Sequence, residues 1–338
     1  MIEVRHLTKR FGAKIAVDDL SFNVRSGTVT GFLGPNGAGK TTTLRTIVGL
    51  AHADQGDARI DGVAYRGLPA PMRQVGALLE AKAYHPGRRA RDHLRALAVA
   101  GRIPTSRVDE VLGIVGLSDV AGRRAGGFSL GMAQRLGIAA ALLGDPPVLL
   151  FDEPVNGLDP EGIVWARNLM QSLAAQGRTV FVSSHLMSEM ALTASHVIVI
   201  GRGRLIADSS IEDIVNGSSR TSVRLRTPEP ELVLPRLEAA GAVVARNGDG
   251  AITVTGLAAP AVGDLAFQAG APVHELVTVQ ASLEEAFMEL TQGAVEFGAG
   301  AAPTGGALAG AAPATWPTAT QAPWASPGAQ TAPGPEEH

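Results

Sequence analysis

The nine residues GPNGAGKTT, at positions 34–42, decide how the rest of the chain is interpreted. They follow the apolar segment TVTGFLG and open a helix that we expect to begin near Lys40. In such a turn, successive backbone N–H groups curl around phosphate oxygens, and a side chain at Gly37 or Gly39 would obstruct that fit. We expect Lys40 to reach the β- and γ-phosphates of a nucleotide and Thr41 to bind Mg²⁺. The predicted nucleotide-binding residues of this phosphate-binding loop are Gly34, Pro35, Asn36, Gly37, Ala38, Gly39, Lys40, Thr41 and Thr42.

A pair of carboxylates follows a second apolar strand, VLLFDEP. Asp152 can hold Mg²⁺ through water, and Glu153 can polarise an attacking water molecule, which is what phosphoryl transfer requires. Alone, this pair of carboxylates is weak evidence for a phosphoryl-transfer site. Together with the phosphate-binding loop, it is strong evidence. His185 ends a later strand, FVSSH, where its imidazole can contact a γ-phosphate or be purely structural.

The composition is that of an ordinary globular protein of two domains. The 338 residues are 45% hydrophobic and 18% charged, with a formal net charge of -3 and no cysteine. No overall basic field favours nucleic acid, and disulfides and cysteine metal sites are excluded. The N-terminus lacks an apolar signal-peptide core, and the apolar run GIAAALLGDPPVLLF is broken by Asp145 and two prolines. We therefore expect a soluble chain that works at a membrane only through another protein.

The strand and helix pattern predicts an α/β domain over residues 1–217. Strands are expected at IEVRHL, LSFNV, ARIDG and VGALLE, and a helical region from Arg91 to about Gly116. The continuously apolar segments VLLFDEP and TVFVSSH indicate buried strands of a parallel-type sheet. HVIVIGRGRLIADSS is typical of a hairpin that turns at residues 201–203.

The pattern of predicted strands and helices changes after residue 217. Residues 218–292 predict a small α+β domain in the order strand, helix, strand, strand, helix, strand, which is the ferredoxin-like order, with one extra helix at SLEEAFMEL. Residues 293–338 are rich in Ala, Gly, Pro and Thr without periodicity, so we expect a disordered tail. Trp316 and Trp324 in this tail are there by chance or mark a partner-binding segment.

The motifs taken in order resemble the nucleotide-binding subunit of an ABC (ATP-binding cassette) transporter. They are the phosphate-binding loop, FSLGM, VLLFDEP, NGLDP and SSH, and the resemblance covers residues 2 to about 217. It implies an ABC-type P-loop ATPase fold with a RecA-like mixed-sheet core, an antiparallel β subdomain and a helical subdomain. It also implies ATP and Mg²⁺ as ligands, with Lys40, Glu153 and His185 as catalytic residues.

The resemblance further implies a homodimer of two cassettes packed head to tail. Ser129 and Gly131 of the signature segment, residues 128–132, would then bind the γ-phosphate of the ATP held by the other cassette. Asn156, Leu158 and Asp159 would form the loop that crosses between the subunits. Phe11 stands where the family places its adenine-stacking aromatic residue, and a core position is the equal alternative.

Two departures from the family pattern indicate which branch of the family the chain resembles. The signature segment is Phe-Ser-Leu-Gly-Met where the family has Leu-Ser-Gly-Gly-Gln, and Glu80 stands where a Gln usually approaches the metal. Glu80 is thus a third candidate metal ligand beside Thr41 and Asp152. Both departures resemble the daunorubicin-, bacitracin- and lantibiotic-type exporters and immunity systems, as does the C-terminal segment ASLEEAFMELT.

A basic stretch lies between Glu80 and the signature segment. It is a solvated helix face, or it faces a permease segment and anionic lipid next to the groove where the family docks its membrane subunit. The arginines concerned are Arg88, Arg89, Arg91, Arg95, Arg102 and Arg107.

These observations predict an ATPase subunit at the cytoplasmic face of a membrane that drives a separate permease and exports a drug, antibiotic or lipid-like compound. A soluble ABC ATPase acting on ribosomes or DNA is the first alternative, although such proteins usually have two cassettes or long coiled coils. A module that senses ATP without hydrolysing it is the second, and Glu153 argues against it. A GTPase or small-molecule kinase would leave the signature segment unexplained. We expect no nucleic acid partner, and the sequence does not identify the cargo.

Overall fold

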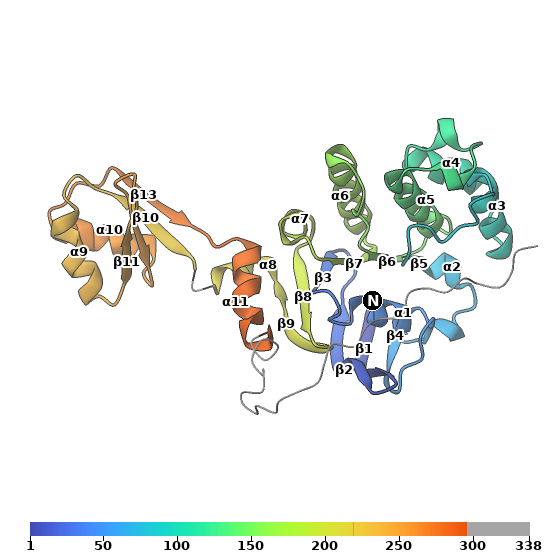
Figure 1. Cartoon of the computed structure of the whole chain (residues 1–338), viewed down its shortest axis with the longest axis horizontal. Helices are drawn as coiled ribbons and strands as arrows, with labels where there is room; N and C mark the ends of the chain where they lie inside the picture. The colour runs from blue at the N-terminus through green and yellow to red at the C-terminus, as the bar shows by residue number, and fades with distance from the viewer. Residues whose placement is uncertain (219, 296–338) are drawn as a thin grey trace, which may run out of the picture. The chain divides into compact units, whose positions relative to one another are not determined.

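A six-stranded sheet forms the centre of the molecule, whose computed structural model describes residues 1–218 and 220–295 (Figure 1). Its strand order is β5-β6-β7-β3-β8-β9, and all neighbours are parallel except the β8–β9 hairpin. The strands are β3 (Val29–Leu33), β5 (Val75–Leu78), β6 (Val148–Asp152), β7 (Thr179–Ser184), β8 (His196–Gly201) and β9 (Arg204–Ser210). Every residue of β3 and β7 is buried, as expected for central strands of a parallel sheet that is covered on both faces.

Helices and a second sheet cover the two faces of this central sheet. On one face α1 (Lys40–Ile47) and the three-stranded antiparallel sheet β2-β1-β4 enclose a core that includes the mutually tilted rings of Phe22, Phe32 and Phe181. The three strands are β1 (Ile2–Phe11), β2 (Lys14–Val24) and β4 (Gln55–Ile60). On the other face lie α6 (Pro160–Ala175) and α7 (Met187–Thr193), and α8 (Ile211–Asn216) follows β9. The expected mixed-sheet core and antiparallel β subdomain are thus present.

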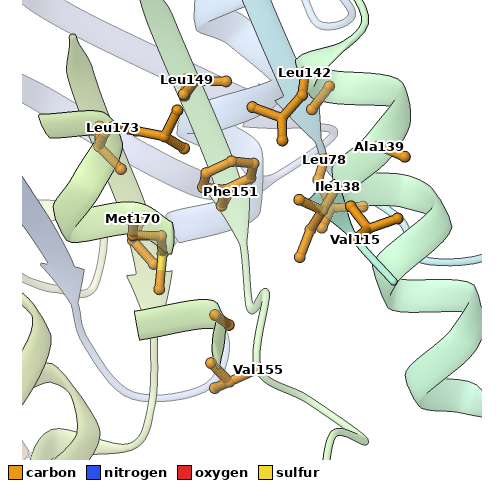
Figure 2. Close-up of a cluster of buried hydrophobic side chains, with 14 of the residues drawn as sticks. Leu78, Val115, Ile138, Ala139, Leu142, Leu149, Phe151, Val155, Met170 and Leu173 are labelled. Atoms are coloured by element: carbon orange, nitrogen blue, oxygen red, sulfur yellow. The ribbon is translucent and has the colours of Figure 1, made fainter. Parts of the chain in front are cut away.

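The helical subdomain packs against β5 and β6. It contains α2 (Pro71–Gln74), α3 (Ala90–Ala100), α4 (Ser106–Ile114) and α5 (Leu130–Leu142), with 3₁₀ turns at Tyr65–Gly67, Ser118–Val120 and Ala125–Gly127. Figure 2 shows Ile138 and Leu142 of α5 beside Phe151 of β6, with Met170 and Leu173 of α6 on its other side. This core fixes α5 relative to the strand that carries the predicted carboxylates.

The helical region expected from Arg91 to about Gly116 is confirmed and consists of two helices with a break between them. Helix α3 ends at Gly101, Arg102 adopts a left-handed conformation (φ 51°), and α4 begins only after Pro104. The residue before a proline is disfavoured in helical geometry, and Pro104 has no N–H to continue the helix. The periodicity continues across the break because both helices bury apolar residues in the same core.

Residues 222–279 form the expected order of strands and helices. The elements are β10 (Ser222–Arg226), α9 (Pro230–Ala239), β11 (Val243–Arg246), β12 (Ile252–Thr255), α10 (Ala259–Gln268) and β13 (Glu275–Val279). Its four strands pair antiparallel in the order β11-β12-β10-β13, and this C-terminal sheet has its own core, which includes Val223, Leu237 and Val262.

The last helix, α11 (Leu283–Val295), packs on the cassette, although the sequence placed it in the small domain. Leu283 and Ala286 are almost fully buried in the core that includes Met187 and Ile214. Ser218 Oγ donates a hydrogen bond of 2.7 Å to Glu289 on this helix. Trp316 and Trp324 of the expected tail lie outside the described residues. Among the described residues, no helix is long and apolar enough to cross a bilayer.

Candidate nucleotide-binding site

The phosphate-binding loop lies between the end of β3 and the start of α1, where backbone packing requires glycine at two positions. A Cβ on Gly34 would come within 2.5 Å of the Ile200 carbonyl oxygen, and one on Gly39 within 2.4 Å of the Ala16 carbonyl oxygen. Gly39 also has φ 108°, which L side chains rarely adopt. Gly37 has φ 81° but faces no protein atom within 4 Å, so its missing side chain leaves space toward the cavity.

A cavity of about 350 Å³ opens over this loop. Its lining residues are Phe11, Lys14, Ala16, Asn36, Gly37, Ala38, Gly39, Lys40, Thr41, Thr42 and Glu153. Phe11 is 57% exposed, and Lys9 Nζ lies 5.3 Å from the centre of its ring. Phe11 is therefore no core residue, and its exposed ring faces the cavity as a stacking surface.

Lys40 points back over the loop. Its Nζ donates hydrogen bonds to the carbonyl oxygens of Gly34 at 2.6 Å and Pro35 at 3.4 Å. Burial lowers the pKa of Lys40, and the nearby carboxylates of Glu153 and Asp152 oppose that shift in part. A phosphate anion that approaches this poorly solvated ammonium group stabilises its charged form.

Asp152 and Thr41 bring two side-chain oxygen atoms together beside the phosphate-binding loop. Thr41 Oγ1 donates a 2.7 Å hydrogen bond to Asp152 Oδ2, although 111 residues separate them. Ser183 Oγ donates to the other carboxylate oxygen of Asp152. This contact follows from the sheet register, since Asp152 of β6 pairs with Ser183 of β7. A carboxylate and a hydroxyl so placed are hard oxygen ligands suited to Mg²⁺.

Glu153 is held in an unusual backbone conformation beside His185. Its φ is 51°, and its N–H donates to the Ser183 carbonyl at 3.2 Å and to Ser183 Oγ at 3.0 Å. His185 Nδ1 lies 2.8 Å from Glu153 Oε2. The structure thus brings the predicted acidic residue and the predicted histidine into direct contact. A non-glycine residue in left-handed geometry is stored strain that concentrates at functional sites.

The signature segment (residues 128–132) lies at the exposed start of α5. The predicted crossing loop (residues 156–159) lies at the exposed start of α6. Ser129 caps α5, where its Oγ accepts a 3.2 Å hydrogen bond from the Met132 N–H. Asp159 caps α6, where its Oδ1 accepts a 3.0 Å bond from the Gly162 N–H. Neither Ser129 nor Gly131 is among the described residues that line the cavity over the phosphate-binding loop.

Glu80 lies after β5 and lines a different cavity of about 520 Å³, together with Tyr84, His93 and Leu97. It is not among the described residues that line the cavity over the phosphate-binding loop. The structure joins Thr41 to Asp152 by a hydrogen bond, and the described contacts do not test Glu80 as a ligand beside them.

Two residues of the site were not predicted from the sequence. Ser183 bonds both Asp152 and Glu153, and Gln134 donates from Nε2 to the Glu153 carbonyl oxygen at 3.0 Å. The available signal was a polar residue at a position expected to be buried: Ser183 inside an apolar strand, and Gln134 in the apolar helix after the signature segment.

Comparisons with known proteins decide the family. The ABC transporter family model matches residues 17–156, and a family described as a domain of unknown function matches residues 221–284. The uncharacterized ABC transporter ATP-binding protein YhcH of Bacillus subtilis is 35% identical over 294 residues, which cover 86% of this chain and 96% of YhcH. The chain belongs to the ABC transporter ATP-binding proteins.

Two further comparisons agree with this membership. The bacitracin transport ATP-binding protein BcrA of Bacillus licheniformis is 42% identical over 211 residues, or 62% of this chain and 69% of BcrA. A solved ATP-binding subunit of an ABC transporter superposes with a TM-score of 0.59 at 27% identity, covering 64% of this chain and 92% of that one. This ABC protein is thus an ATP-binding and ATP-hydrolysing subunit coupled to transport, as the motif order predicts.

Proposed function

We propose that two copies of this ABC subunit close around two ATP molecules, hydrolyse them, and thereby drive export of a drug, antibiotic or lipid-like compound through a separate permease. The relative BcrA, a bacitracin transport protein, supports a cargo of this amphiphilic kind. One observation carries the shared-site part of the proposal. The cavity with Lys40 and Glu153 is lined by no residue of the described signature segment, whose Ser129 is exposed elsewhere. An anion-binding helix start therefore faces outward, free to meet a second molecule.

In this proposal the ATP phosphates lie in the phosphate-binding loop, with Lys40 on the β- and γ-phosphates. Thr41 and Asp152 would hold Mg²⁺, directly or through water, and the bound ion would supply positive charge opposite the transferred phosphoryl group. The support is the 2.7 Å contact between the two side-chain oxygens. Glu80, in the loop after β5, is the third candidate ligand in this proposal.

Glu153 acts as the group that orients and polarises the attacking water in this proposal. His185 orients Glu153 through the 2.8 Å contact between Nδ1 and Oε2, and it contacts the γ-phosphate from the same side. Phe11 stacks on the adenine, which its exposed ring supports. Ser129 and Gly131 bind the γ-phosphate held by the other copy, and Asp159 belongs to the loop that crosses between the copies.

The permease lies on the membrane side of the helical subdomain, and the subunit works at the cytoplasmic face of the cell membrane. The cavity of about 520 Å³ beside α3 is the docking site for a permease segment, supported by its mostly aliphatic and aromatic lining. Arg88, Arg89 and Arg95 are exposed at the same helix and suit contact with anionic lipid.

The C-terminal sheet belongs to the ferredoxin-like class in this proposal. Its support is the element order β10-α9-β11-β12-α10-β13 and the antiparallel strand order β11-β12-β10-β13. The extra helix α11 tethers this unit to the cassette.

The variant Glu153→Gln tests the proposal. It keeps the size of the side chain but removes the carboxylate, so ATP should bind normally while turnover falls by about 10³-fold. Without hydrolysis the closed pair should persist, and sedimentation with ATP and Mg²⁺ should show a stable dimer. Wild-type turnover in this variant would remove Glu153 from the reaction, and a monomer with bound ATP would refute the shared site. The matched control is Glu161→Gln, which changes an exposed carboxylate in the first turn of α6.

A further inference from the structure

Helix α5 makes a buried contact with the backbone of Glu153 in its own chain. Gln134, only 2% exposed, donates from Nε2 to the carbonyl oxygen of Glu153 at 3.0 Å. That carbonyl belongs to a residue held at φ 51°, whose N–H is bonded on the opposite side by Ser183. The peptide units around Glu153 are therefore fixed from two elements, β7 and α5, and a rotation of α5 pulls on one of them.

The first turn of α5 also packs directly on the crossing loop. A Cβ on Gly157 would lie 2.2 Å from Leu130 Cδ2, so the Leu130 side chain occupies the space above this glycine. A Cβ on Gly131 would lie 3.1 Å from the Gly157 carbonyl oxygen. Gly157 has φ 76°, and the segment from Glu153 to Gly157 is only five residues long. Helix α5 thus touches both ends of the segment that follows β6, through Gln134 at Glu153 and through Leu130 at Gly157.

We propose that Gln134 and Leu130 are positioning residues that couple the two ATP sites of the dimer. The inference rests on the shared-site dimer proposed above, in which Ser129 serves the ATP of the other copy while Glu153 serves its own. When Ser129 seats on the other copy's γ-phosphate, α5 moves as a rigid helix. Gln134 and Leu130 then set the Glu153 backbone and the crossing loop at the chain's own site. Binding at one site thereby aligns the carboxylate at the second.

The substitution Gln134→Met tests this coupling, because methionine keeps the side-chain length and helix propensity but cannot donate a hydrogen bond. We expect the turnover of the full chain to fall about tenfold, since a small misplacement of a catalytic group costs that much or more. The Hill coefficient for ATP should fall from about 2 toward about 1, because two coupled sites become independent. Binding of fluorescent ATP to the isolated chain should change by less than about twofold, because Gln134 does not line the cavity.

The matched control is Gln171→Met. Gln171 Nε2 donates to the Leu192 carbonyl at 2.9 Å, the same type of bond, but between α6 and α7 and away from the site. Its turnover and Hill coefficient should stay at wild-type values. The second test is Leu130→Gly, which removes the contact with Gly157 from an exposed side chain and decides the question if Gln134→Met does not fold. This variant should also lose cooperativity with unchanged ATP binding by the single chain.

The outcomes separate this inference from the proposed function. Loss of cooperativity in the Gln134 and Leu130 variants, but not in the Gln171 control, supports the coupling. If the wild-type protein is cooperative and the folded variants are equally cooperative, the inference is wrong and the shared-site dimer stands. A fall in turnover with an unchanged Hill coefficient also overturns it, because the two residues then act on one site alone. If the wild-type protein forms no ATP-dependent dimer, the proposed function itself fails.

Discussion

At the scale of single residues, the buried position of Lys40 reduces the stability of the nucleotide-free fold. Lys40 is 8% exposed, and the only hydrogen-bond acceptors of its ammonium group among the described residues are two carbonyls of its own loop. Burial lowers its pKa, so the folded protein without nucleotide holds a charge that water would solvate better. Active sites commonly retain a destabilising buried charge of this kind, because the bound ligand offsets its free-energy penalty.

The substitution Lys40→Met should therefore separate stability from function. We expect the nucleotide-free variant to unfold at a temperature equal to or above that of the wild type, because an apolar side chain replaces a buried charge. ATP at a hundredfold excess over its Kd stabilises the wild type by about 2.7 kcal/mol, and the variant should lose this gain. Thermal melts with and without ATP and Mg²⁺ measure both effects. A variant that is strongly destabilised without nucleotide would contradict the account.

The same substitution has a pH dependence of defined sign. The pKa of Lys40 is lowered from its ordinary value of 10.5, so the unfolded chain binds the proton more tightly than the folded one. The penalty for burying this lysine is then fully present below the lowered pKa and disappears as pH rises through it. The stability advantage of Lys40→Met should accordingly shrink as pH is raised toward 10.5.

At the scale of elements, the strands and turns that depend on a local sequence pattern could be predicted from the sequence. Uninterrupted apolar runs identify β6 and β7 because both faces of a central strand are buried. The turn of the β8–β9 hairpin falls at Arg202 and Gly203, both with positive φ, as its composition indicates. These features are encoded within a few neighbouring residues.

Contacts between distant elements were harder to predict. The apolar face of α11 is visible in the sequence, but periodicity does not say which surface covers it, and the helix packs on α7 and α8. Likewise, Gln134 reaches Glu153 only because α5 and β6 share one core. The motifs predict candidate residues for the phosphate site because each motif is a short, continuous stretch of sequence. The bonds that join those loops depend on the tertiary fold.

Truncations on either side of α11 test its place in the cassette. Removal of residues 283–338 exposes the pocket filled by Leu283 and Ala286, which should cost about 2 kcal/mol or more of cassette stability. Removal of residues 296–338 alone should change the stability by less than about 0.5 kcal/mol and leave ATPase activity intact. Thermal denaturation and turnover of the two truncated chains compare them directly. Equal stability would mean that α11 contributes nothing to the cassette.

At the scale of the whole molecule, the positions of the motifs indicate that one chain holds two half sites. Lys40 and Glu153 line one cavity, whereas Ser129 stands exposed at the start of α5 outside it. In a head-to-tail pair, each complete site takes its phosphate-binding loop from one copy and its signature segment from the other. Two defective chains can then assemble one intact site if their defects lie in different halves.

Mixing Lys40→Met with Ser129→Arg makes that consequence measurable. Neither variant should form an ATP-dependent dimer alone, because one lacks phosphate binding and an arginine blocks closure of the other. The mixed dimer joins the unaltered loop of the Ser129→Arg chain to the unaltered signature segment of the Lys40→Met chain. It should occlude one ATP per pair, detected by sedimentation with labelled nucleotide. A chain with both substitutions, mixed with Ser129→Arg, offers no intact combination and serves as the control. If the two mixtures occlude equally little ATP, each site must be complete within a single chain, and the head-to-tail arrangement is wrong.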